Sequence, residues 1–125
     1  MRTMQTANIM NRFHNCRVLK DERIREIGQG VFAGRKKSSL TCEEIKARRA
    51  GDKSYGLETL EELYLRVIDF INDVKRKYSD KNILVVTHGA VLNCIESIIE
   101  HKVFDCEKFS HWKKYNNCQI LYLDV

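Results

Sequence analysis

The clearest pattern of apolar positions runs from Leu60 to Tyr78. Apolar residues there recur at steps of three and four, which places them on one face of a helix, and charged residues occupy most of the remainder. Thr59 and Glu62 fit a capping box at the start, in which each side chain bonds the backbone N–H of the other residue. The segment is therefore predicted to be an amphipathic helix that packs one face into a core.

Three other segments have helical spacing. They cover residues 3–13, residues 41–51 after a second capping-box pattern (TCEE), and residues 90–101. Residues 20–40 contain several glycines and are predicted to form a loop. Gly51 follows the second helical pattern directly, which is typical of a helix C-terminus.

Residues 83–87 (ILVVT) have the composition of a buried strand. They are β-branched and apolar on both faces, as in a central strand of a parallel sheet covered by helices. Residues 119–125 alternate like a terminal edge strand, and residues 17–19 form a short strand candidate. The order helix, strand, helix predicts an α/β fold, a three-layer α/β/α sandwich.

Composition agrees with a single globular domain over residues 1–125. Apolar residues make up 43% of the chain and charged residues 31%, so a core is available. The longest apolar runs are far shorter than the roughly 20 residues that a membrane-spanning helix needs. The five cysteines lack C-x-x-C spacing, which predicts free thiols in a reducing compartment and no metal site. We therefore expect a cytoplasmic protein with no membrane partner.

Charge favours anionic partners without selecting among them. The net charge of +5 suits a nucleic acid, a phosphorylated metabolite or mere solubility. The basic clusters 35–37 and 48–49 are interleaved with polar and acidic residues and contain no aromatic residue for base stacking. They are therefore predicted to be solvated faces, and nucleic acid is not an expected partner.

The strongest chemical signal is His88, which follows the predicted strand and precedes a helix. Ligands of α/β proteins bind beyond the carboxyl ends of strands, and a helix N-terminus offers unpaired N–H groups that suit phosphate. Gly89 would let the backbone approach a ligand closely and adopt a positive φ. Histidine also changes its charge near neutral pH, so His88 is a candidate catalytic residue.

Two weaker signals accompany His88. Arg2 precedes a predicted helix, and an arginine beside a helix N-terminus can clamp a phosphate. The acidic residues of 21–28 lie beside arginines, where a carboxyl can act as a general acid if anionic neighbours favour its protonated form. Residues 28–33 (GQGVFA) fit the G-x-G-x-x-[GA] dinucleotide pattern, but the charged residues before them do not form the buried strand that this motif requires.

Four blocks of the chain together resemble the histidine phosphatase superfamily, whose fold is phosphoglycerate mutase-like. Residues 2–7 (RTMQTA) look like its R-x-x-Q-T-A helix start, and residues 22–34 (ERIREIGQGVFAG) look like its L-x-E-x-x-x-G-x-W-E-G loop. Residues 56–59 (GLET), with Arg66, look like its G-x-E-[ST] segment, and residues 86–89 (VTHG) match its V-T-H-G. The blocks follow the family's order and span effectively the whole chain.

The resemblance assigns roles residue by residue. Arg2 would bind phosphate, Glu26 would donate a proton to the leaving oxygen, and His88 would hydrogen-bond the phosphoryl oxygens, with Gly89 beside it in the phosphate pocket. The expected partner is a phosphorylated small molecule. Phosphoryl transfer depends on cationic positioning and protonation of the leaving group, and arginine and histidine can supply both, so no metal or other cofactor is expected.

The chain departs from the family at its front. Phe32 and Ala33 stand where the family has Trp and Glu, and no Arg-His pair occurs, although the family's nucleophile is the histidine of an Arg-His-Gly motif. We therefore expect a sandwich that lacks its first strands, a truncated C-terminal part that is inactive on its own. Its strand at residues 83–87 would then leave an open sheet edge through which the chain could form oligomers.

Several functions stay open at this stage, including whether the chain is an enzyme. The intact protein is expected to hydrolyse phosphate monoesters through a phosphohistidine. Phosphoglycerate mutase-type transfer is an alternative, although residues 34–56 leave little room for a substrate-enclosing insertion. A non-catalytic pseudoenzyme that binds phosphate or protein is another, and a basic nucleic-acid-binding domain is a third.

Overall fold

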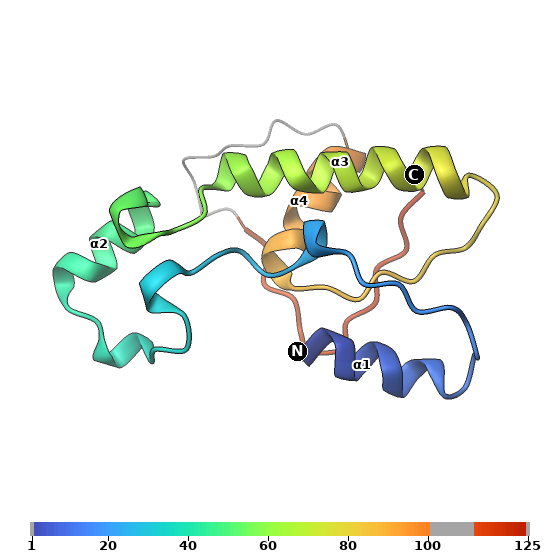
Figure 1. Cartoon of the computed structure of the whole chain (residues 1–125), viewed down its shortest axis with the longest axis horizontal. Helices are drawn as coiled ribbons and strands as arrows, with labels where there is room; N and C mark the ends of the chain where they lie inside the picture. The colour runs from blue at the N-terminus through green and yellow to red at the C-terminus, as the bar shows by residue number, and fades with distance from the viewer. Residues whose placement is uncertain (1, 101–111, 125) are drawn as a thin grey trace.

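The computed structural model describes residues 2–100 and 112–124. Within these residues the α-helices are α1 (Arg2–Asn11), α2 (Cys42–Ala50), α3 (Leu60–Tyr78) and α4 (Gly89–Ile99) (Figure 1). Short 3-10 turns lie in the loops between them, at Glu22–Ile24, Gly30–Phe32, Lys37–Ser39 and Lys53–Tyr55. The predicted end of the last helix, near residue 101, falls just outside the described residues.

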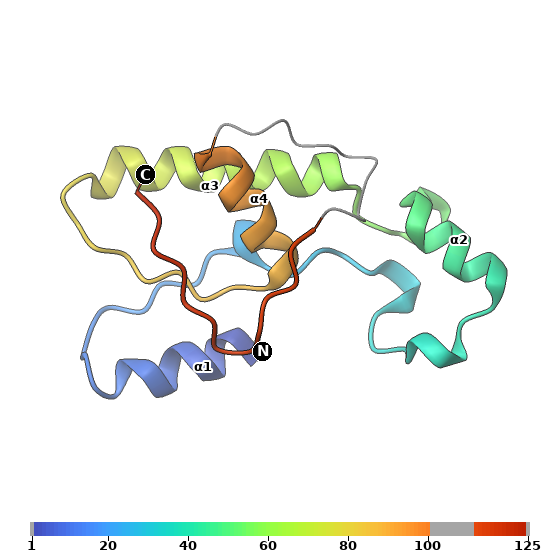
Figure 2. The same ribbon diagram turned by 180° about the vertical axis from the view of Figure 1, so that it is seen from behind.

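The hydrophobic core lies between α3 and α4, which cross each other in both views of Figures 1 and 2. α3 contributes the apolar face that its sequence spacing predicts, and α4 covers it. The 3-10 turn Glu22–Ile24 also packs against α3. The buried residues of this core are Leu60, Leu63, Val67, Phe70, Ile71, Val91, Cys94 and Ile95.

Both predicted capping boxes are confirmed. The hydroxyl of Thr59 accepts the N–H of Glu62 at 3.2 Å, and the Glu62 carboxylate accepts the N–H of Thr59 at 2.9 Å. Thr41 and Glu44 make the same reciprocal pair at the start of α2. α2 ends at Gly51, whose φ of 65° lies in the left-handed region that favours glycine. These local contacts fix where α2 and α3 begin.

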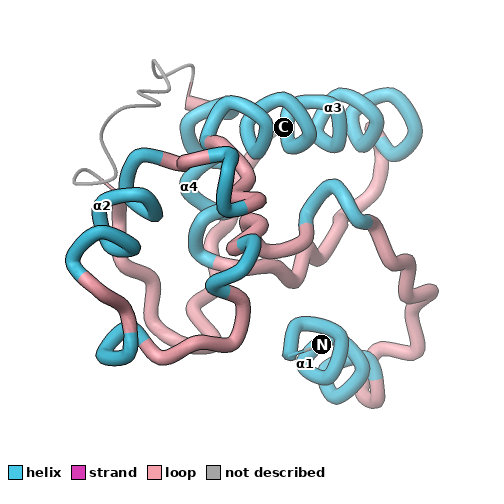
Figure 3. The backbone as a smooth tube through the Cα atoms, turned by 60° about the vertical axis from the view of Figure 1, so that its left-hand side comes forward, coloured by secondary structure: helices cyan, strands magenta, loops and turns pink. Residues whose placement is uncertain are grey.

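The predicted three-layer α/β/α sandwich is wrong, because the described residues form no strand. Residues 83–87, the alternating segment at 119–124 and residues 17–19 all run as loop, as the tube in Figure 3 shows. The one isolated β-type pair among them joins Gln29 to Leu57. A β-branched segment favours an extended backbone, but a strand also needs a neighbour to accept its hydrogen bonds. The described chain supplies no such neighbour beside residues 83–87.

The described part of the chain has no sheet, and so it offers no sheet edge through which copies could pair. Apolar side chains that a sheet would have covered are instead open to solvent, with Ile83 43% exposed, Leu84 59% and Ile120 56%. Such exposed apolar residues are a common source of association. Self-association of the chain therefore stays a prediction, now through these side chains.

α1 stands apart from the core. It has no buried residue, and it lies away from α3 and α4 in Figures 1 and 3. The predicted helix at residues 3–13 is thus confirmed as an element, with little tertiary packing to hold it. None of the described helices has the length and apolar character to cross a bilayer.

Candidate active site

His88 lies directly before α4 and acts as its N-cap residue. Its backbone is extended, its carbonyl accepts the N–H of Leu92 at 3.0 Å, and its side chain makes no capping hydrogen bond. The first N–H groups of a helix have no partner within the helix and carry partial positive charge. The His88 side chain therefore does not satisfy these N–H groups at the start of α4.

Glu26 contacts the imidazole of His88. Glu26 Oε2 lies 3.2 Å from Nδ1 of His88, and Glu26 Oε1 accepts the N–H of Ile27 at 3.1 Å. The His88 side chain is largely buried, at 17% exposed, whereas that of Glu26 is 42% exposed. Nδ1 faces Glu26, and within residues 2–100 and 112–124 no hydrogen bond reaches the second ring nitrogen, Nε2.

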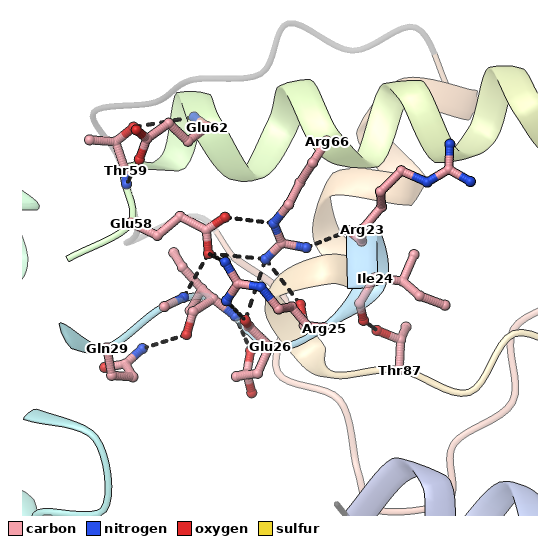
Figure 4. A network of polar contacts seen from close by, with 12 residues as sticks. Arg23, Ile24, Arg25, Glu26, Gln29, Glu58, Thr59, Glu62, Arg66 and Thr87 are labelled. Atoms are coloured by element: carbon pink, nitrogen blue, oxygen red, sulfur yellow. Dashed lines mark hydrogen bonds and ion pairs between the residues drawn. The ribbon is translucent and has the colours of Figure 1, made fainter. Parts of the chain in front are cut away.

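A hydrogen bond between two loops brings Glu26 and His88 together. The hydroxyl of Thr87, next to His88, donates to the carbonyl of Ile24 at 2.6 Å. This bond joins residues that are 63 positions apart in the chain. It therefore places the segment before α4 beside the loop that carries Glu26, as Figure 4 shows for Thr87 and Ile24.

The loop that carries Glu26 is held from α3 by Arg66 (Figure 4). The Arg66 guanidinium donates to the carbonyls of Arg23, Arg25 and Glu26, the last two at 3.0 and 3.4 Å. It also forms a two-point ion pair with Glu58, at 2.5 Å from Nε and 3.0 Å from Nη2. One side chain of α3 thus binds the loop backbone at three carbonyls.

Glu58 completes this network on the other side of Glu26. Its Oε2 accepts the N–H of Gly28 at 2.6 Å, and its own N–H donates to the carbonyl of Gly28 at 3.1 Å. Burial disfavours the charged form, but the hydrogen bonds from Arg66 and Gly28 and the charges of Arg66 and Arg25 outweigh it, so the pKa of Glu58 lies below its ordinary value. Glu58 is therefore a carboxylate at neutral pH.

This lowered pKa makes the Glu58 contribution to stability depend on pH. A carboxyl whose folded pKa is depressed stabilises the fold above its unfolded pKa, and that stabilisation is lost as pH falls through the folded pKa. We expect Glu58→Gln to lower the free energy of unfolding by about 2 kcal/mol at neutral pH, since hydrogen bonds to a charged group are lost. Below the folded pKa of Glu58 the difference from the wild type should shrink, as measured by urea unfolding across acid pH.

Glu61→Gln is the matched control for this acid series. Glu61 is an exposed neighbour on α3, and no hydrogen bond or ion pair joins it to another described residue. The free energy of unfolding of Glu61→Gln should stay close to that of the wild type across the same pH range. A Glu58→Gln difference that is equally large at neutral and acid pH would show that Glu58 does not act through its charge.

A cavity of about 550 Å³ lies beside the Glu26 loop, between that loop, α2 and the start of α3. Ile27, which follows Glu26 in the chain, is part of its wall. Its basic lining comes from Lys37, Arg48 and Arg49, and Nε of Arg48 donates to Oε1 of Gln29 at 2.9 Å. The carboxylates of Glu58 and Glu61 also line the cavity, so it combines basic and acidic groups.

The structure brings together some of the residues singled out from the sequence. Glu26 and His88 are in contact, and Gly89 follows as the first residue of α4. The positive φ expected at Gly89 is wrong, because Gly89 has helical geometry and a Cβ there would meet Tyr115 at an ordinary 3.7 Å. Arg2 opens α1 with an exposed side chain, and among the described residues no hydrogen bond or ion pair joins its guanidinium to Glu26 or His88.

The contacts of Arg66 and Glu58 with the Glu26 loop were not predicted, although both residues belong to the motif quoted from the sequence. The available signal was a carboxylate directly before a capping box, with an arginine two helical turns into the helix that follows. Among the described residues, no group of three or more His, Cys, Asp or Glu side chains is arranged to hold a metal ion.

Comparison with known proteins places the chain in a family. The family model for the histidine phosphatase superfamily (branch 1) matches residues 1–125. No solved structure shows significant similarity to the chain.

Curated relatives are named "Probable phosphoglycerate mutase GpmB". The relative from Enterobacter sp. (strain 638) is 35% identical over 104 residues, which cover 78% of this chain and 48% of the relative. Relatives from Photorhabdus laumondii and Escherichia coli O1:K1 are 30% and 33% identical over the same shares of each chain. The chain thus spans about half the length of the curated relatives it matches. The match over the whole chain shows that it belongs to the histidine phosphatase superfamily.

Proposed function

We propose that the protein hydrolyses phosphate monoesters, with Glu26 as proton donor and His88 as a ligand of the phosphoryl group. The observation that carries the proposal is the 3.2 Å contact between Glu26 and His88 at the uncapped start of α4. A carboxyl and an imidazole side by side at a helix N-terminus combine proton donation with stabilisation of negative charge.

Each group has a defined part in the proposed reaction. Protonated His88 donates through Nε2 to a phosphoryl oxygen, and the first N–H groups of α4 face the same anion. The bond between phosphorus and the ester oxygen breaks, and its electron pair goes to that oxygen. Protonated Glu26 supplies the proton to that oxygen as general acid. The phosphoryl group passes to a nucleophile.

The nucleophile is the part of the proposal that these 125 residues do not contain. In the superfamily it is the histidine of an Arg-His-Gly motif, and the sequence has no Arg-His pair. Loss of a nucleophile costs on the order of 10⁶ in rate. We therefore expect the 125-residue chain to bind phosphate without measurable turnover.

Inorganic phosphate and an aryl phosphate test this proposal. Phosphate at about 100 times its Kd should stabilise the chain by about 2.7 kcal/mol, seen as a rise in Tm. His88→Ala should abolish that rise, and the matched control His14→Ala, which changes an exposed histidine after α1, should retain it. Hydrolysis of the aryl phosphate by the chain would contradict the expected inactivity. If phosphate does not raise the Tm of the wild type, the proposed phosphate site is contradicted.

Phosphoglycerate mutase-type transfer is the second candidate, favoured by the names of the relatives. A mutase returns the phosphoryl group to a second hydroxyl of its substrate, whereas a phosphatase passes it to water. A form of the protein that carries the Arg-His-Gly segment distinguishes them. Release of inorganic phosphate without interconversion of phosphoglycerates supports hydrolysis, and interconversion without release supports the mutase.

A further inference from the structure

We infer that Arg66 is a positioning residue for Glu26, and that it acts with Glu58 to hold the Glu26 carboxyl against His88. The catalytic purpose of this positioning rests on the proposed function, because there Glu26 is the proton donor. The positioning itself is a structural claim that can be measured without any turnover.

The first step of the inference is that packing does not fix Glu26. Its side chain is 42% exposed, so few atoms surround the carboxyl. Its direction depends instead on the backbone from which it projects and on the N–H of Ile27, which donates to Oε1. Whatever fixes the backbone on both sides of Glu26 therefore fixes the carboxyl.

The second step is that Arg66 and Glu58 fix that backbone on both sides. Arg66 binds the carbonyl of Glu26 and two carbonyls before it, and Glu58 binds the N–H of Gly28 after it. The Arg66 side chain is 15% exposed and that of Glu58 is 10% exposed, so both are better enclosed than Glu26. The loop is therefore anchored to α3 by Arg66 and to the segment before α3 by Glu58, and the two enclosed side chains pair with each other.

The third step is that the geometry needs a guanidinium. A guanidinium presents several N–H donors in a rigid plane, so Arg66 can bind the Glu58 carboxylate and the carbonyls of the loop at once. A lysine at this position could keep the charge pair with Glu58, but its ammonium is a compact point charge that cannot span the same acceptors. Arg66→Lys therefore separates the role of the positive charge from the role of the planar guanidinium with its several N–H donors.

The test reads the tautomer of the His88 ring by ¹⁵N NMR at alkaline pH, where imidazoles are neutral. A carboxylate held at Nδ1 favours the tautomer with the proton on Nδ1, since the partner of one ring nitrogen decides which nitrogen carries the proton. In the wild type we expect His88 to show this Nδ1–H signature. Glu26→Ala should abolish it and define the signal of an unpositioned His88.

Arg66→Met should then shift His88 to the signal found in Glu26→Ala, although residue 66 does not touch the imidazole. Arg66→Lys should give the same shift while retaining the fold, and it keeps the test valid if Arg66→Met fails to fold. The matched control is Arg35→Met, which breaks a similar two-point ion pair with Glu44 away from the site. Its His88 signal should remain that of the wild type.

The outcomes separate this inference from the proposed function. A folded Arg66→Lys or Arg66→Met protein with the wild-type His88 signal would overturn the positioning role of Arg66. An unchanged signal in Glu26→Ala would show that Glu26 does not hold His88, which would remove the contact on which the proposed function depends. A shift with Arg66 variants, in a chain that shows no phosphate effect on Tm, would support the inference and contradict the proposed phosphate site.

Discussion

Glu26→Gln should slow hydrolysis of phosphate esters with poor leaving groups by about 10²–10⁴-fold, the usual contribution of a general acid. An alkyl ester oxygen leaves as a strong base and needs the proton, whereas an aryl oxygen bearing electron-withdrawing groups needs it far less. The slowing should therefore be much smaller for an activated aryl ester. The measurement is kcat for the two ester classes in a form of the protein that carries the nucleophilic histidine.

A nearby carboxylate provides the control for this comparison. Glu22 lies in the same loop, is exposed and pairs with Lys20 at the surface. Glu22→Gln should leave both ester classes unaffected. If Glu26→Gln slows both classes equally, Glu26 binds or orients the substrate and does not donate the proton.

Leu63→Ala should have the largest effect on stability. Leu63 is fully buried between α3 and α4, in the core on which the described fold depends. Truncating such a leucine removes buried methyl groups and leaves a cavity, which costs about 2–5 kcal/mol. That loss is a large share of the free energy of unfolding of native domains, which is typically about 5–15 kcal/mol. Urea unfolding with far-UV circular dichroism would measure it.

Leu65→Ala is the matched control on the same helix. Leu65 lies two residues away but faces solvent, at 58% exposed. Its truncation should change the free energy of unfolding by no more than about 0.5 kcal/mol. Equal losses in the two variants would contradict the orientation of α3 and therefore the packing of α4 against it.

The helices could be predicted because their signals are local. α3 has the bounds expected from its capping box and its apolar spacing, and α2 ends at the glycine that its pattern indicates. Both signals act over one or two helical turns, so no distant part of the chain is needed to realise them. The presence of α4 after His88 was predicted for the same reason.

Local sequence signals could not show whether the chain forms a sheet. The β-branched side chains of residues 83–87 favour an extended backbone, but a strand exists only when a neighbour completes its hydrogen bonds. Composition says nothing about whether that neighbour is present. The layer architecture and the strand at residues 83–87 were therefore both predicted wrongly.

The chemical roles predicted for the candidate site stay predictions, and its geometry was predictable only in part. Glu26 and His88 could be singled out from the sequence. Their contact depends on the hydrogen bond from Thr87 to Ile24, which joins segments that are distant in the chain. The role of Arg66 could not be read from its spacing, because its acceptors are backbone carbonyls that any residue type would offer. The phosphate-binding role of Arg2 stays a prediction.

A structure of the chain with bound vanadate tests the central claim most directly, because vanadate mimics a phosphoryl group in transfer. The account predicts vanadate within about 3 Å of Nε2 of His88 and of the first N–H groups of α4, with Glu26 at its edge. Vanadate bound in the basic cavity of Lys37, Arg48 and Arg49 instead, with the start of α4 empty, would contradict it.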